Sequence, residues 1–248
     1  MMHRWITFRA TLVAIVFVTT VSQVTATNGV STRVQLPTSA GPVPAELFQP
    51  QGESKRPAIL VLHGAGGTIL DGPEMRRVAR YLAAEGNAAY VLHYFNRTGT
   101  TVALDGTMTK HFPAWRETVR ESVVAIQQLR GNSEPIGIYG YSLGGFLAIS
   151  SASENPRVGA VVAHAGGVWN GREDRIGRMP PVLIVHGERD ARVPFSRYAV
   201  PLQRLLATRG RKPETLFFAN EGHRFTPAAM AETRAAAVKF FRRHLRPR

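Results

Sequence analysis

Residues 136–145, Ile-Gly-Ile-Tyr-Gly-Tyr-Ser-Leu-Gly-Gly, contain the turn that decides the fold. The apolar run 136–139 predicts a buried strand, and the residues from about 143 to 153 predict a helix. Ser142 therefore lies in a sharp turn between a strand and a helix. Such a turn pushes the serine toward positive φ and brings backbone close on both sides, which explains glycine at 140 and 144. We expect the turn to raise the Ser142 hydroxyl above the edge of a sheet.

Short apolar runs alternate with longer runs of helical period along the rest of the chain. This alternation is typical of βαβ units. Residues 30–36 and 43–48, separated by a Gly-Pro turn, predict an opening antiparallel hairpin. We expect an α/β fold with a mostly parallel central sheet and helices on both faces. Further strands are expected at 58–62, 88–94, 158–163, 182–185 and 215–218, further helices at about 73–86, 115–129, 194–209 and 227–245, and a loop rich in Gly and Thr at 96–109.

His223 is the candidate general base for Ser142. It follows the expected strand 215–218 and precedes the last helix. A serine hydroxyl is a poor nucleophile at neutral pH and needs a base that titrates near 7, which is the property of histidine. The structural alternative is a histidine that only caps the helix beginning near Pro227.

Asp190 is the candidate acid that orients the histidine. It ends the run His-Gly-Glu-Arg-Asp at 186–190, just past an expected strand. A carboxylate there can accept the N–H of His223 and stabilise the imidazolium. Glu188 is the rival, and a plain turn residue is the structural alternative for Asp190. The chain order serine, acid, histidine is that of α/β-hydrolases.

Residues 63–67, His-Gly-Ala-Gly-Gly, follow the strand 58–62 and predict part of an oxyanion hole. We expect the backbone N–H of Leu143 to be one donor and that of Ala65 the other, with Gly66 as the fallback. A glycine-rich phosphate loop is the competing interpretation. It is disfavoured because the lysine and hydroxyl residues of such a loop are absent.

The remaining histidines do not have the spacing of a metal site such as His-Glu-x-x-His. We expect structural roles for them and neither a metal nor a cofactor. They are His93, His111, His164, His186 and His244. Trp115, Tyr94 and Phe95 are expected in the core.

The first 26 residues resemble a secretory signal peptide, with a basic start, an apolar run over 10–21 and small residues at 24–26. An uncleaved anchor is the alternative, although the apolar run is shorter than the roughly 20 residues of a spanning helix. The chain has no cysteine, which excludes disulfides and a thiol nucleophile. We expect a cleaved leader at 1–26, one catalytic domain at 27–248, and a periplasmic or secreted location.

The formal net charge of the 248-residue chain is +14. The basic residues are spread over the expected helices and the carboxyl end, which favours a solvated basic surface. No recognition helix, zinc finger or aromatic RNA-binding motif accompanies the charge, so no nucleic-acid partner is expected. A weak attraction to anionic surfaces is the remaining interpretation.

Five motifs together resemble the dienelactone hydrolase family of α/β-hydrolases, over about residues 34–245. They are residues 60–64, 94–99, 140–145, 186–190 and 222–225. The resemblance implies a compact enzyme without a large lid, a small ester or lactone as substrate, no cofactor, and a triad of Ser142, Asp190 and His223. The namesake enzymes carry a cysteine nucleophile, and Ser142 places this chain with the serine-bearing relatives.

The sequence therefore predicts an exported serine hydrolase that acts on a small carboxylic ester or lactone. Two alternatives stay open. One is a serine peptidase or acyl-aminoacyl hydrolase with the same fold. The other is a non-catalytic binding protein built on the hydrolase fold.

Overall fold

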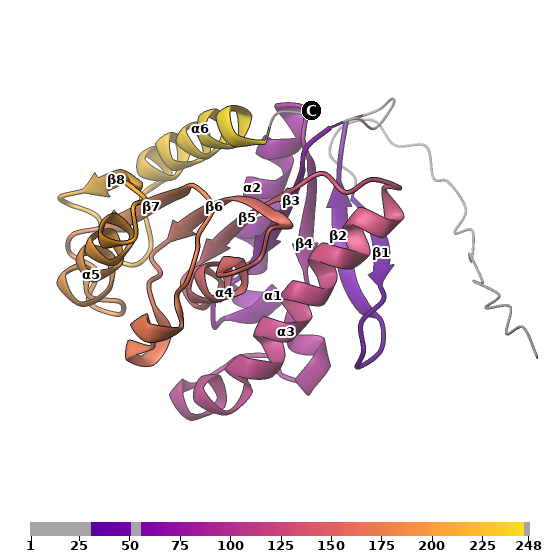
Figure 1. Cartoon of the computed structure of the whole chain (residues 1–248), viewed down its shortest axis with the longest axis horizontal. Coiled ribbons are helices and arrows are strands. Elements are labelled where there is room, and N and C mark those ends of the chain that lie inside the picture. Colours follow the sequence, from indigo (N-terminus) through magenta and orange to yellow (C-terminus); the bar gives the residue numbers. More distant parts are fainter. Residues whose placement is uncertain (1–30, 51–55, 246–248) are drawn as a thin grey trace, which may run out of the picture.

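The computed structural model describes residues 31–50 and 56–245, which form one eight-stranded sheet with helices on both faces (Figure 1). The predicted leader at 1–26 lies outside the described residues. The strand order is β1-β2-β4-β3-β5-β6-β7-β8. The strands are β1 (Thr32–Leu36), β2 (Val43–Phe48), β3 (Ala58–Leu62), β4 (Ala88–Leu92), β5 (Ile136–Tyr141), β6 (Val158–His164), β7 (Val182–Gly187) and β8 (Glu214–Phe218). The α-helices are α1 (Gly67–Leu70), α2 (Gly72–Ala84), α3 (Asp105–Leu129), α4 (Leu143–Ala152), α5 (Phe195–Thr208) and α6 (Pro227–His244), and the 3₁₀ helices are η1 (Tyr94–Thr98), η2 (Trp169–Gly171) and η3 (Glu173–Arg175).

The sheet combines an antiparallel edge with a parallel centre. β2 pairs antiparallel with both β1 and β4, which confirms the predicted opening hairpin. From β4 through β3, β5, β6 and β7 to β8 all pairs are parallel. Every residue of β3, β4 and β5 is buried. Strands covered on both faces read as continuous apolar runs, which is why periodicity located them.

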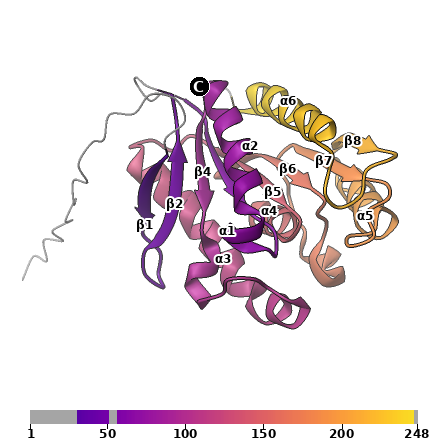
Figure 2. The same cartoon turned by 180° about the vertical axis from the view of Figure 1, so that it is seen from behind.

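The helices cover the sheet in two layers. α3, α4 and α5 lie on the face toward the viewer in Figure 1, and α2 and α6 lie on the face toward the viewer in Figure 2. Each layer has its own apolar cluster. The first includes Trp115 and Phe146, and the second includes Met75 and Phe241. The predicted core positions Trp115, Tyr94 and Phe95 are all buried.

The prediction of a loop at 96–109 is wrong for residues 105–109. α3 begins at Asp105 and continues through Pro113. Glycine, threonine and an internal proline lower helix propensity, so the sequence pattern favoured a later start. Met108 and Phe112 lie buried in the core, and their burial stabilises the extra turns. Because no helix among the described residues is both long and apolar enough, none of them could span a bilayer.

The turn at Ser142 has the geometry that the sequence predicted. Ser142 has φ 53° and ψ −121°, and Leu143 begins α4 directly after it. A Cβ added to Gly140 would lie 2.1 Å from the carbonyl oxygen of Gly144. A Cβ added to Gly144 would lie 2.5 Å from the carbonyl oxygen of Leu62. The two glycines are therefore required by direct backbone contact.

We expect Gly144→Ala to lower the free energy of unfolding by about 3 kcal/mol, because the new methyl group would overlap β3 backbone that cannot move aside. Urea unfolding measures the change. Gly106→Ala is the matched control, since a Cβ at that helical position meets nothing within 4 Å. The control should gain about 0.5–1 kcal/mol. Equal stability of Gly144→Ala and the parent protein would contradict this account of the turn.

Candidate active site

Three strand ends bring the predicted triad together at the carboxyl edge of the sheet. Ser142 follows β5, Asp190 follows β7 and His223 follows β8. Nε2 of His223 lies 3.0 Å from Oγ of Ser142, and Nδ1 lies 2.8 Å from Oδ2 of Asp190. With Nδ1–H donating to the carboxylate, Nε2 is left to accept the serine hydroxyl proton. The rival carboxylate, Glu188, is exposed.

The Asp190 carboxylate is buried but fully engaged by donors. Its Oδ1 accepts the backbone N–H groups of Arg192 at 2.9 Å and Val193 at 2.7 Å. Nε2 of His186 lies 3.5 Å from Oδ2. Burial raises the pKa of this carboxyl, but the contacts with His186, His223 and Val193 outweigh it and hold the pKa of Asp190 well below its ordinary value. Asp190 is therefore an anion at neutral pH, as an acid that stabilises an imidazolium must be.

Side-chain hydrogen bonds hold the loop that carries His223. The Tyr141 hydroxyl donates to the carbonyl oxygen of His223 at 3.1 Å. The Glu221 carboxylate accepts the backbone N–H and the hydroxyl of Thr226 at 2.8 and 2.6 Å. Thr226 itself caps α6, through its side chain and the N–H of Ala229. Thr226 thus has the capping role that was the structural alternative for His223.

The backbone N–H groups of Leu143, at the first position of α4, and of Ala65, in the loop after β3, have no acceptor among the described residues. The peptide that carries the Ala65 N–H is held by the bond from the Gly67 N–H to the Gly64 carbonyl oxygen at 3.1 Å, and the next peptide by the bond from the Ala103 N–H to the Ala65 carbonyl oxygen at 2.8 Å. The fallback prediction, Gly66, is wrong, because its N–H donates to Oδ2 of Asp71 at 2.8 Å.

Asp71 is a residue of the site that the sequence analysis missed. Its side chain is nearly buried and lies directly under the glycine loop, with Oδ2 only 2.6 Å from where a Cβ on Gly64 would be. Burial raises the pKa of Asp71, and the Gly66 N–H and the Arg224 and His223 charges oppose that rise. Asp71 precedes Gly72 and Pro73, a pattern typical of the start of a helix. This pattern does not indicate the hydrogen bond between the Asp71 carboxylate and the Gly66 N–H.

His63 supports the same loop from the other side. Its Nδ1 lies 2.8 Å from the carbonyl oxygen of Gly64, and its ring stacks on Tyr94 with centroids 4.1 Å apart. The Tyr94 hydroxyl donates to the His63 carbonyl oxygen at 2.8 Å. Burial lowers the pKa of His63 to about 3, so the ring is neutral and holds the loop by hydrogen bonding and stacking.

The other histidines, for which the sequence analysis expects structural roles, contact neighbouring side chains or backbone. His93 contacts Glu46 at 2.8 Å, His164 contacts the Tyr139 hydroxyl at 2.9 Å, and His186 contacts the carbonyl oxygen of Val193 at 2.8 Å; His244 contacts Glu214 at 3.3 Å, and His111 packs on Trp115. Within residues 31–50 and 56–245, no three His, Asp or Glu side chains gather in a way that could hold a metal ion.

A cavity of about 240 Å³ opens beside the histidine loop. Tyr141, Phe225 and Met230 supply its apolar walls, and Asp71 and Arg224 supply charge. The Arg224 guanidinium lies 3.6 Å from Asp71 and is mostly exposed. The cavity therefore adjoins residues next to both Ser142 and His223 in the chain and has room for a small organic group.

The chain is similar to known hydrolases in sequence and in structure. The profile of the dienelactone hydrolase family matches residues 43–246. No curated protein is similar enough in sequence to count as a match.

Solved structures share the fold at low sequence identity. A dienelactone hydrolase from Anabaena variabilis has a TM-score of 0.66 at 18% identity, covering 87% of this chain and 98% of that one. A Xanthomonas campestris protein described as an α/β serine hydrolase without a lid has a TM-score of 0.66 at 18% identity, with 86% and 94% covered. An acylaminoacyl peptidase from Pyrococcus horikoshii has a TM-score of 0.68 at 14% identity, with 87% of this chain but 41% of that chain covered. These likenesses show the α/β-hydrolase fold.

We expect Asp71→Ala to lower kcat for p-nitrophenyl acetate by roughly 10- to 100-fold with little change in KM, because the loop that presents the Ala65 N–H loses its anchor. Asp71→Asn should retain more activity, since its amide oxygen can still accept from Gly66. Steady-state kinetics with far-UV circular dichroism checks both. Asp174→Ala removes an exposed carboxylate elsewhere and serves as the control. A rise in KM alone for Asp71→Ala would contradict a positioning role.

Proposed function

Because the chain belongs to the dienelactone hydrolase family and has the α/β-hydrolase fold, we propose that it is an exported serine hydrolase that cleaves a small carboxylic ester or lactone. The observation that carries the proposal is the position of His223. One ring nitrogen lies 3.0 Å from the Ser142 hydroxyl oxygen and the other lies 2.8 Å from a buried carboxylate. This arrangement is the one that turns a serine hydroxyl into a nucleophile.

The reaction begins at Ser142. Its Oγ attacks the ester carbonyl carbon while Nε2 of His223 takes the hydroxyl proton, and the resulting imidazolium is stabilised by Asp190. The tetrahedral intermediate then expels the alcohol, which receives the proton from His223. A water molecule, activated in turn by His223, attacks the acyl-enzyme and releases the acid.

The developing oxyanion is stabilised by backbone donors. We assign this role to the N–H groups of Leu143 and Ala65, neither of which has an acceptor among the described residues. The amino end of α4 adds its positive dipole at the same point. Preorganised donors of this kind contribute about 2.7–4 kcal/mol each to transition-state stabilisation in serine hydrolases.

The comparisons support an ester rather than a peptide as substrate. The chain covers nearly all of the Anabaena and Xanthomonas structures but only 41% of the acylaminoacyl peptidase. More than half of that peptidase therefore lies outside the shared fold. The resemblance to compact relatives, one of them described as without a lid, favours a small substrate.

Export is the second part of the proposal. It is supported by the basic and apolar pattern of residues 1–26 and by the lack of cysteine. A periplasmic or secreted enzyme would begin at Thr27 after cleavage. Expression in a Gram-negative host, followed by fractionation and amino-terminal sequencing, tests this. Full-length protein that stays in the cytoplasm would contradict export.

We expect Ser142→Ala to lower kcat for p-nitrophenyl acetate by at least about 10⁴-fold while leaving the thermal unfolding temperature near that of the parent. Ser196→Ala, which removes an exposed hydroxyl on α5, is the matched control and should keep parental turnover. Stopped-assay and continuous kinetics on purified proteins measure both. Parental turnover by Ser142→Ala would contradict the proposed mechanism. A panel of p-nitrophenyl esters with increasing acyl length then defines the substrate.

A further inference from the structure

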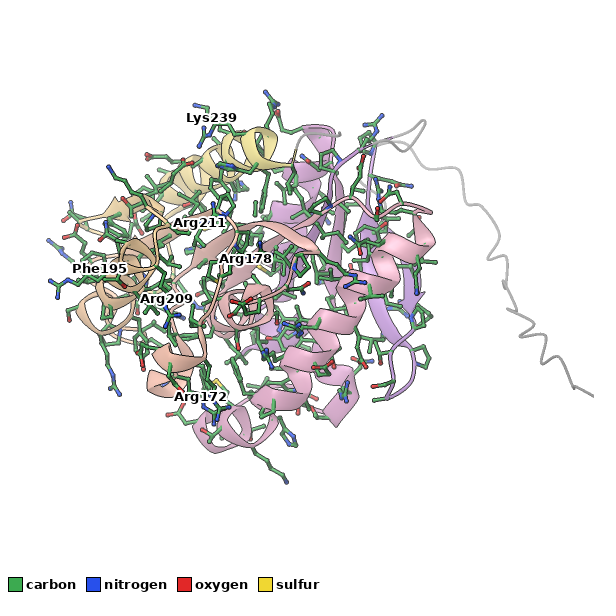
Figure 3. All side chains as sticks on the ribbon, viewed as in Figure 1. Arg172, Arg178, Phe195, Arg209, Arg211 and Lys239 are labelled. Atoms are coloured by element: carbon green, nitrogen blue, oxygen red, sulfur yellow. The ribbon has the colours of Figure 1, made fainter. Side chains whose placement is uncertain are left out.

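A second cavity, of about 170 Å³, lies between α3, α4 and the segment that carries η2 and η3. Three arginines line it: Arg116 from α3, and Arg172 and Arg175 from the segment after β6. We call it the arginine pocket. Figure 3 shows Arg172 beside the first turns of α3. The proposed mechanism uses none of these residues.

Most N–H donors of the guanidinium groups in the arginine pocket have no acceptor among the described residues. Nε of Arg116 donates to the carbonyl oxygen of Ser150 at 3.0 Å, and its two terminal nitrogens have no acceptor among the described residues. The side chains of Arg172 and Arg175 are exposed and likewise donate to no described residue. A guanidinium has five N–H donors, so most of the donors here are available to a ligand.

The charge of the pocket is not neutralised from within. None of the described residues that line it is acidic. Burial lowers the pKa of Arg116, and the charges of Arg120 and Arg175 lower it further, against the opposing charge of Glu117. Glu117 is exposed and outside the pocket lining, and Glu173 lines a neighbouring cavity instead. The like charges around Arg116 therefore repel one another, and a bound anion would relieve that repulsion.

The pocket is separate from the catalytic serine. Ser150 lies two turns along α4 from Ser142, roughly 12 Å at 1.5 Å per residue. Phe112 and Trp169 line the pocket and stack with centroids 4.5 Å apart. Trp169 in turn packs against Phe146, one turn from Ser142. An aromatic layer thus lies between the two regions of α4.

Arg116 also has a structural task, which must be distinguished from binding. It and Arg120 donate to carbonyl oxygens at the carboxyl end of α4, where cations are stabilising. That task needs neither Arg172 nor Arg175, because neither donates to α4. The side chains of Arg172 and Arg175 consequently have no hydrogen bond or ion pair within the described part of the chain that would explain their place around the cavity.

We propose that the arginine pocket binds a tetrahedral oxyanion, a phosphate or sulfate group. Guanidinium groups bind such oxygens in bidentate pairs, and three arginines line this one cavity. A water molecule takes about 30 Å³ of liquid volume, so a cavity of about 170 Å³ has room for the anion. A dianion should bind better than acetate, because it can engage two guanidiniums at once.

Inorganic phosphate is the probe, titrated into the full folded chain at constant ionic strength with chloride as the balancing ion. Isothermal titration calorimetry should show saturable binding to the parent that is at least about tenfold tighter than acetate binding. The double variant Arg172→Gln and Arg175→Gln should raise the phosphate Kd by about tenfold or more. Arg178→Gln, an exposed arginine of the same segment outside the lining, should change it less than about twofold.

The proposal would be overturned by the lack of saturable phosphate binding to the parent, by equal binding of phosphate and acetate, or by an unchanged Kd in the double variant. Arg116→Gln provides a second measurement, read together with its unfolding temperature in chloride. If it stays folded, it should also lose phosphate binding. If folded Arg116→Gln protein binds phosphate like the parent, Arg116 only stabilises α4, and the proposal that the arginine pocket binds phosphate is contradicted.

Discussion

The positive φ of Ser142 is the constraint on which the rest of the structure depends. An L-residue held at φ 53° is strained, and the strain persists only because β5 and α4 are both fixed by burial on either side. Gly140 and Gly144 have no room for a side chain, and Gly144 rests against the carbonyl oxygen of Leu62. This contact ties the nucleophile turn to β3. The loop directly after β3 carries Ala65, so this packing contact also joins the serine turn to the loop of the proposed second backbone donor.

Burial and hydrogen-bond donors together determine which side chains around the serine are charged. The Asp190 side chain is fully buried, yet its pKa is lowered because donors surround it, so it faces His223 as an anion. His63 and His164 are buried without such partners, and burial lowers the pKa of each to about 3. They remain neutral at physiological pH. His223, one fifth of whose side chain is exposed, by contrast has a carboxylate partner, access to solvent and a contact with the Ser142 hydroxyl.

Much of this architecture could be predicted from the sequence, and the exceptions have physical causes. Buried parallel strands leave continuous apolar runs, so β3 through β7 were located from the sequence, although the carboxyl ends of β4 to β7 differ from the predicted ones by one or two residues. The first turns of α3 were missed because tertiary burial of Met108 overrides weak local propensity. Asp71 was missed because its contact with Gly66 joins two loops, and such a contact leaves no periodic signal. The roles of Leu143 and Ala65 as donors remain predictions.

The proposed acyl-enzyme at Ser142 is tested most directly by covalent labelling with a fluorophosphonate, followed by intact mass and peptide mapping. Activated serines react with such probes because the base removes the hydroxyl proton during attack. The account predicts one adduct per chain, on the peptide that contains Ser142, and its loss in His223→Ala. An adduct on another serine, or labelling of His223→Ala at the parental rate, would contradict the account.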